Sequence, residues 1–140
     1  MKVCVLYAPK GSESLRVRDV ADRFAQGIRS AGNLAQVYNV NTNANARIIK
    51  PALFDHTVVI AEPTGILGGR IPASVAAFLG SCASVTGLKS SCYITGWCLR
   101  MHKTLQCLMG TMEREGMFLR VSDVVRNPDH AFAIGKRLVI

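Results

Sequence analysis

The sequence predicts an α/β fold in which a five-stranded parallel sheet, with its strands in the order 2-1-3-4-5, lies between two layers of helices. Short apolar runs alternate with longer amphipathic segments along the chain, and parallel neighbours need crossover connections, which are nearly always right-handed. For five such strands, 2-1-3-4-5 is the common doubly wound order. A length of 140 residues with 49% hydrophobic residues suits a single domain, residues 1–140.

The first strand is predicted at residues 2–7 (KVCVLY), an apolar run that ends before Pro9 and Gly11. An amphipathic helix follows, because apolar residues recur at intervals of three and four while charged residues occupy the other face. Gly32 supplies the C-terminal end of this helix. Its apolar face comprises Val17, Val20, Ala21, Phe24, Ala25 and Ile28.

The second strand is predicted at residues 35–40 (AQVYNV), and the asparagine-rich stretch 39–45 has the composition of a turn. A short helix around residues 44–49 is the weakest element of the pattern. The third strand, residues 57–61 (TVVIA), is clearer. It ends before Pro63, because proline cannot donate a hydrogen bond within a central strand.

Three further helices and two strands complete the pattern. Pro72 suits the first turn of a helix over residues 72–79, and strands are predicted at 91–95 (SCYIT) and 118–125 (FLRVSDVV). A final helix is expected over residues 128–138. The helix between the last two strands ends at Gly116 and has an apolar face formed by Met101, Leu105, Leu108, Met109 and Met112.

The five cysteines predict a reduced protein without a structural metal. Their number is odd, none is two residues from another, and the three histidines do not form a zinc-binding spacing with them. Cys4 and Cys92 fall within predicted strands, where buried thiols behave as small hydrophobic groups. The apolar run at the N-terminus is too short for a signal peptide or a membrane span. We therefore expect a cytoplasmic protein.

The chain carries 17 basic and 9 acidic residues, a net charge of +8, which bears on partners rather than on fold. Aromatic and basic residues are not interleaved, which argues against nucleic-acid binding. A response-regulator receiver needs an acidic pair after the first strand, where this chain has Pro9 and Lys10. A dinucleotide site or an NTPase site is disfavoured because neither glycine-rich phosphate motif is present.

In this topology a ligand binds beyond the carboxyl ends of the strands, near the switch point between strands one and three. The loop after the first strand, residues 8–14, leads into a helix N-terminus, which attracts anions. Its suitable phosphate partners are Lys10, Gly11, Ser12 and Ser14. On this loop alone, an ordinary turn with a serine cap is an equally good interpretation.

The loop after the third strand, residues 62–70, contains Gly65, Gly68 and Gly69, which permit close approach of the backbone to a flat ligand. The loop after the fourth strand, residues 96–100, contains the sole tryptophan, Trp97. Its ring either packs against the protein, which is commoner, or stacks on an aromatic ligand.

Cys98 lies in the same loop, near Arg100 and His102. These cations would lower the pKa of its thiol and make it redox-active. A partly exposed thiol without a role is the commoner alternative.

Three segments resemble flavodoxins: residues 3–32, 54–79 and 87–116, together nearly the whole chain. The most diagnostic part is the Asp-x-x-Val-Val-Ile-x-x-Pro-Thr arrangement from Asp55 to Thr64. The resemblance implies a flavodoxin-like three-layer sandwich that binds FMN. The phosphate would lie on the 10–14 loop, and the isoalloxazine ring would lie between the loops of Thr64 and Trp97.

The resemblance further implies an FMN-binding protein that transfers electrons or reduces a small acceptor, without a catalytic side chain or a metal. The positive charge would select an acidic redox partner or an anionic substrate. The residues expected to bind the cofactor are Lys10, Gly11, Ser12, Glu13, Ser14, Pro63, Thr64, Gly65, Ile66, Leu67, Gly68, Thr95, Gly96, Trp97, Cys98 and Arg100.

A second interpretation is a degenerate flavodoxin-like module that binds no flavin and serves as an interaction domain. Glu13 puts a carboxylate where a phosphate is expected. Gly65 stands where an aromatic residue often follows Pro-Thr, and the net charge is opposite to that of most electron-shuttling flavodoxins. An absorbance spectrum of the purified protein distinguishes the two interpretations.

Overall fold

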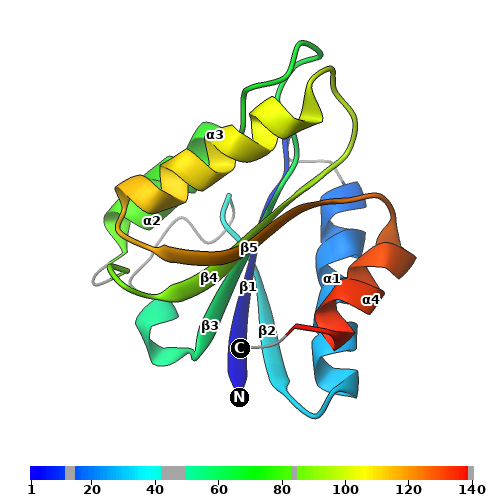
Figure 1. The fold of residues 1–140 in the computed structure, drawn as a ribbon, viewed down its shortest axis with the longest axis vertical. Helices are drawn as coiled ribbons and strands as arrows, with labels where there is room; N and C mark the ends of the chain where they lie inside the picture. Colours follow the sequence, from blue (N-terminus) through cyan, green and yellow to red (C-terminus); the bar gives the residue numbers. More distant parts are fainter. Residues whose placement is uncertain (12–14, 42–49, 83–84, 139–140) are drawn as a thin grey trace.

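The computed structural model describes residues 1–11, 15–41, 50–82 and 85–138. All strands in these ranges are parallel and form one sheet in the order β2-β1-β3-β4-β5, so the predicted fold is confirmed (Figure 1). The strands are β1 (Lys2–Ala8), β2 (Leu34–Asn39), β3 (His56–Ala61), β4 (Lys89–Thr95) and β5 (Phe118–Val125).

Helices cover both faces of the sheet. Helices α1 and α4 pack together on one face, and α2 and α3 lie on the other (Figure 1). The described helices are α1 (Arg16–Ser30), α2 (Ala73–Ser81), α3 (Met101–Arg114) and α4 (Pro128–Lys136), with a short 3-10 turn at Pro51–Leu53. The helix expected at 44–49 lies outside the described residues. Among the described helices, none has the length and apolar character that crossing a bilayer requires.

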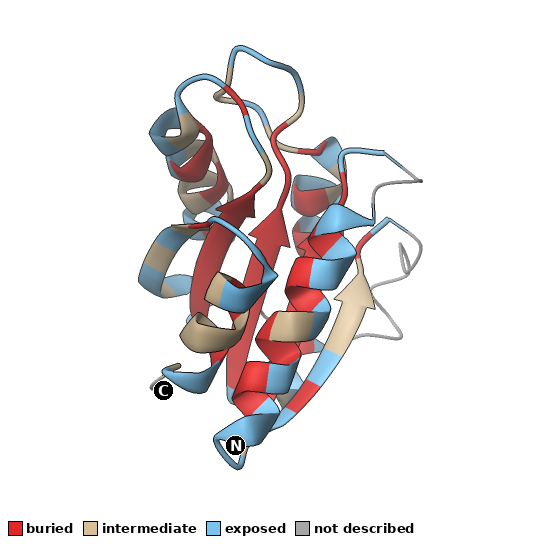
Figure 2. Ribbon diagram, turned by 90° about the vertical axis from the view of Figure 1, so that its right-hand side faces the viewer, coloured by how far each residue is buried: buried red, intermediate tan, exposed pale blue. Residues whose placement is uncertain are grey.

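The central strands are buried on both faces. Every residue of β3 is buried, and so are all residues of β1 and β4 except the first of each (Figure 2). The edge strands β2 and β5 are partly exposed. This is why the central strands have continuous apolar runs instead of an alternating pattern.

Several predicted boundaries shift by one or two residues. β2 begins at Leu34 because this residue pairs with Lys2, and β4 begins at Lys89 because this residue pairs with Phe118. α2 begins at Ala73, with Pro72 preceding it, and α4 ends at Lys136 instead of residue 138.

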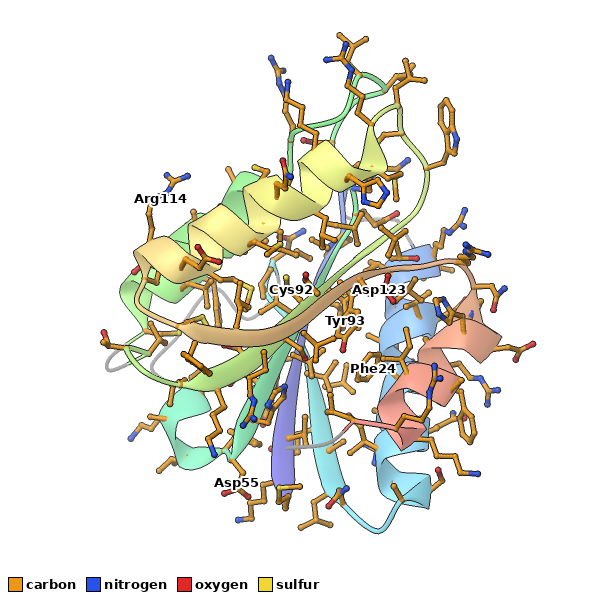
Figure 3. All side chains as sticks on the ribbon, viewed as in Figure 1. Phe24, Asp55, Cys92, Tyr93, Arg114 and Asp123 are labelled. Atoms are coloured by element: carbon orange, nitrogen blue, oxygen red, sulfur yellow. The ribbon has the colours of Figure 1, made fainter. Side chains whose placement is uncertain are left out.

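Two apolar cores lie on the two faces of the sheet. All six residues predicted for the apolar face of α1 are buried, in the core that α1 and α4 cover. Phe24 lies beside Tyr93 of β4, with ring centroids 5.0 Å apart (Figure 3). Cys4 and Cys92 belong to the opposite core, and burial raises the pKa of each thiol to about 12. Their predicted packing role is confirmed.

Asp55, the first residue of the most diagnostic motif, lies at the amino end of the sheet. Its Oδ2 atom accepts a hydrogen bond from the backbone N–H of Lys2 at 2.8 Å. Figure 3 shows Asp55 near the N-terminus, at the end of the molecule opposite to the loops that follow β3 and β4. Asp55 therefore anchors β1 and takes no part in a site at the carboxyl edge.

Candidate functional site

The loops after β1, β3 and β4 meet at the carboxyl edge of the sheet. β1 pairs with β3, and β3 pairs with β4, so the three strand ends are neighbours. The loops after β3 and β4 extend together beyond the sheet at the top of Figure 1. This is the edge at which the topology predicts a ligand site.

Only part of the first loop belongs to the described residues. Lys10 and Gly11 are exposed, whereas Ser12, Glu13 and Ser14 lie outside the described residues. α1 has Leu15 at its N-cap position, without a side-chain hydrogen bond to the helix. The two serines of the alternative interpretation, a serine cap, are among the residues that the structure does not describe.

Glu62, the first residue of the loop after β3, touches all three loops. Its side chain is buried, with 3% of the residue exposed, and Oε1 accepts a hydrogen bond from the backbone N–H of Lys10 at 3.3 Å. Its own N–H donates to the carbonyl of Ala8 at 3.2 Å. A Cβ atom on Gly96 would lie 3.9 Å from Glu62 Oε2. A lone carboxylate directly after a buried strand at the switch point is the signal that could have identified it.

The second and third loops are joined directly. Leu99 N–H donates to the carbonyl of Ile66 at 2.8 Å, and Thr64 N–H donates to the carbonyl of Arg70 at 3.0 Å, which closes the second loop. A Cβ atom on Gly68 would lie 1.9 Å from the carbonyl oxygen of Leu99. Gly68 is therefore required by the contact between the two loops, independently of any ligand.

The third loop carries an exposed indole and a buried hydroxyl. Trp97 is 70% exposed, so the interpretation that it packs against the protein is wrong. Thr95, at the end of β4, is fully buried, and its Oγ1 atom has no hydrogen-bond partner among the described residues. A ligand at this edge would be able to stack on the exposed indole of Trp97 and to form a hydrogen bond with the hydroxyl of Thr95.

Cys98 is buried, with 3% exposed. Its Sγ atom lies 3.3 Å from Thr104 Oγ1 and 3.3 Å from the Met101 sulfur. The expected partial exposure is therefore wrong. A redox-active thiol needs access to its oxidant, so the role of Cys98 is to pack the third loop onto α3.

Two pockets flank the start of α3. One, of about 440 Å³, lies between the second loop and α3 and is lined by residues 64–70, Arg100 and Lys103. The other, of about 870 Å³, lies at the end of β5, and its lining includes Met101, His102, Asp123 and His130. Both volumes fall in the range of ligand pockets. The second pocket could not be predicted from the sequence, because its lining comes from three elements that share no motif.

Among the predicted site residues, the structure brings Lys10, Pro63 and Gly96 to Glu62, and it brings Ile66 and Gly68 to the third loop. Gly65 is exposed, and a Cβ atom there would meet no atom within 4 Å. Leu67 is also exposed. Arg100 begins α3 in the left-handed conformation, with φ 58° and ψ 56°.

The chain is similar in structure to flavodoxins. The two-electron reduced flavodoxin of Megasphaera elsdenii has 16% sequence identity and a TM-score of 0.73, with 96% of each chain covered. Oxidised flavodoxin 1 of Bacillus cereus has 18% identity and a TM-score of 0.72, with 96% of this chain and 95% of that chain covered. A flavodoxin of Streptococcus pneumonia TIGR4 has 15% identity and a TM-score of 0.72, with 97% and 96% covered.

No protein-family model matches the chain, and no curated protein matches it in sequence. At these identities the structural similarity concerns the fold. The chain has the flavodoxin-like fold along nearly its whole length.

Proposed function

We propose that the chain binds FMN at the carboxyl ends of β1, β3 and β4 and uses it to transfer electrons to a partner protein or to a small acceptor. The observation that carries the proposal is the exposed indole of Trp97, in a loop tied by the Leu99–Ile66 hydrogen bond to the glycine-containing loop after β3. The flavodoxin structures similar to this chain support it. So does the position of the site at the switch point of the sheet.

Several residues at this edge fit a flavin. Trp97 offers an aromatic face for stacking, and the open space beside Gly65 allows a ring to approach the backbone. The buried hydroxyl of Thr95 would gain a partner from a polar ligand.

FMN, when bound, supplies the electron-transfer chemistry. The chain's own contribution is to hold the ring and to exclude water from one of its faces, which is the role we assign to Trp97. Ile66 and Gly68 are in contact with Leu99. The ring therefore belongs on the side of Thr64, Gly65 and Trp97, away from this contact.

The first test uses Trp97 as both probe and ligand contact. Adding FMN to the protein should quench the tryptophan fluorescence, which has a single source in this chain. Trp97→Ala should weaken FMN binding about tenfold, because it removes about 1.5 kcal/mol of stacking. The dissociation constant is measured by absorbance titration at the flavin band.

Trp97→Phe is the matched control, because it keeps an aromatic face and should retain most of the affinity. If FMN binds without changing the emission of Trp97, the tryptophan does not contact the ring. If the untreated protein is colourless and binds no added FMN, the proposal is wrong.

One observation favours the interaction module as a second candidate. The Glu62 carboxylate already accepts a hydrogen bond from the backbone N–H of Lys10, a residue predicted to bind the phosphate. A negative charge at that position opposes a phosphate.

Glu62→Gln tests which of the two candidates applies, since it removes the charge and keeps the shape. We expect the variant to bind FMN about five- to tenfold more tightly than wild type, a gain of about 1 kcal/mol from relieved repulsion. Riboflavin, which lacks the phosphate, should gain much less. Glu113→Gln on the exposed part of α3 is the charge-matched control and should change neither affinity.

An equal gain for FMN and riboflavin would show that Glu62 does not oppose a phosphate. Absence of flavin binding in both wild type and Glu62→Gln would favour the interaction module.

A further inference from the structure

The pocket between the second loop and α3 is lined by three cationic side chains and by no acidic one. Arg70, Arg100 and Lys103 are all exposed, and they border a space of about 440 Å³. Among the described residues, the one ion pair joins Arg23 to Asp129. Arg70, Arg100 and Lys103 therefore concentrate positive charge around one cavity without an anionic partner among those residues.

The shape of this pocket is set by hydrogen bonds of its walls. Gly69 N–H donates to the buried Thr104 hydroxyl at 2.8 Å, and the Leu99–Ile66 bond holds the opposite side. Gly68 also lies close to the backbone carbonyl of Leu99, so the second and third loops are in direct contact beside the pocket. The cavity is consequently preformed, which lowers the cost of binding a ligand.

The structure places part of the Lys103 side chain and gives Arg100 an unusual backbone conformation. A Cβ atom on Gly69 would lie 3.2 Å from Lys103 Cε, so the aliphatic part of the Lys103 side chain lies over this glycine. Arg100 is the one non-glycine residue with positive φ in the described part of the chain. Its conformation costs free energy in a side-chain-bearing residue, and such strain is often found at ligand sites.

Apolar side chains accompany the charges. Ile66 and Leu67, which line the same pocket, are 68% and 77% exposed. A ligand that matches this lining carries an anionic oxygen group for the three cations and an apolar part for the two aliphatic side chains.

We propose that this pocket binds a small organic anion, through a carboxylate or a phosphate group. That this anion is the acceptor of electrons from the flavin rests on the proposed flavin site, because the pocket shares the second and third loops with that site. Anion binding itself does not depend on flavin. The positive charge around this pocket would then select an anionic acceptor at the carboxyl edge of the sheet, beside the proposed flavin site.

The test follows backbone amide signals of the full chain by NMR while inorganic phosphate or hexanoate is added at constant ionic strength and pH. Phosphate represents a phosphate ester, and hexanoate represents a carboxylic acid with an apolar part. We expect at least one anion to shift the amide signals of Gly68, Gly69 and Lys103 in a saturable way. Saturable shifts with hexanoate alone would indicate that the ligand is a carboxylic acid. Saturable shifts with phosphate alone would indicate that it is a phosphate ester.

The double variant R70Q/K103Q should weaken this binding about tenfold, because two charge-assisted contacts are lost. K2Q/K89Q is the matched control. It removes the same charge from exposed residues at the amino ends of β1 and β4, and it should change affinity less than twofold. Equal weakening in the two variants, or no saturable shift at the pocket with either anion, would overturn the proposal.

The flavin titration is a separate measurement. A chain that binds no FMN but shows these shifts would retain the anion site and lose the proposed redox function. Shifts confined to the amides of Lys10 and Gly11 would place the anion at the first loop and would overturn this assignment.

Discussion

Gly27→Ala should destabilise the protein by about 3 kcal/mol, since the added methyl group has no space between α1 and α4. A Cβ atom on Gly27 would lie 2.2 Å from the carbonyl oxygen of Phe132 and 2.9 Å from the backbone nitrogen of Lys136. Both neighbours are backbone atoms, which cannot rotate away. Equilibrium unfolding in urea measures the loss, and the same loss is expected for Gly135→Ala, where the Cβ would lie 2.2 Å from the Phe24 carbonyl oxygen.

Gly110→Ala is the control for this prediction. Gly110 lies within α3, and a Cβ atom there would meet nothing within 4 Å. Because alanine is the better helix former, this change should stabilise the protein by about 0.5–1 kcal/mol. Alanine brings the same gain in helix propensity at Gly27. The steric cost there is larger, so the net effect of Gly27→Ala is a loss of stability. If Gly27→Ala stabilised the protein as Gly110→Ala does, α1 and α4 would not pack this closely.

The stability of the protein should fall by about 3 kcal/mol as the pH decreases from about 6.5 to 4, owing to His56 alone. His56 is 1% exposed, and burial lowers its pKa from 6.5 to about 4, helped by the charges of Arg120 and Lys89. Between these values the unfolded chain binds a proton that the folded chain does not. The contribution is complete above pH 6.5, is lost progressively down to pH 4, and changes no further below that.

His56→Gln removes the titrating group, so its stability should depend less on pH over this range than that of wild type. Urea unfolding at pH 7 and pH 4 gives the loss of stability of each protein between these pH values. Subtracting the loss of the variant from that of wild type cancels the effect of carboxylates, which titrate in both proteins. In the wild-type protein, His56 Nε2 lies 3.0 Å from Ser91 Oγ, while Nδ1 has no partner among the described residues. Equal pH dependence in the two proteins would show that folding does not lower the pKa of His56.

Local sequence patterns predicted most of the secondary structure. Helix α1 followed from residues such as Val17, Phe24 and Ile28, because a helical period brings these side chains to one face whatever the rest of the chain does. The runs that became β1 and β3 are apolar throughout, which is what strands covered on both faces require. The strand order was then predicted from the order 2-1-3-4-5, which is common among folds with five alternating strand–helix units.

The boundaries of the elements were less accurate because they depend on partners distant in sequence. Lys89 belongs to β4 through its pairing with Phe118 of β5, and no pattern around Lys89 indicates this. Nor does composition reveal that Trp97 is exposed while its neighbour Cys98 is buried against Thr104. Both residues are apolar and occupy the same loop.

The amino-acid sequence was sufficient to identify the fold and the buried face of α1, because periodicity and chain connectivity are local properties. It did not reveal the burial of Glu62 among three loops, the contact of Gly68 with Leu99, or the packing of Gly27 and Gly135 between α1 and α4. These features depend on how closely two backbone segments, separated by tens of residues, approach each other. Such distances are determined only when the whole sheet and both helical layers are packed together.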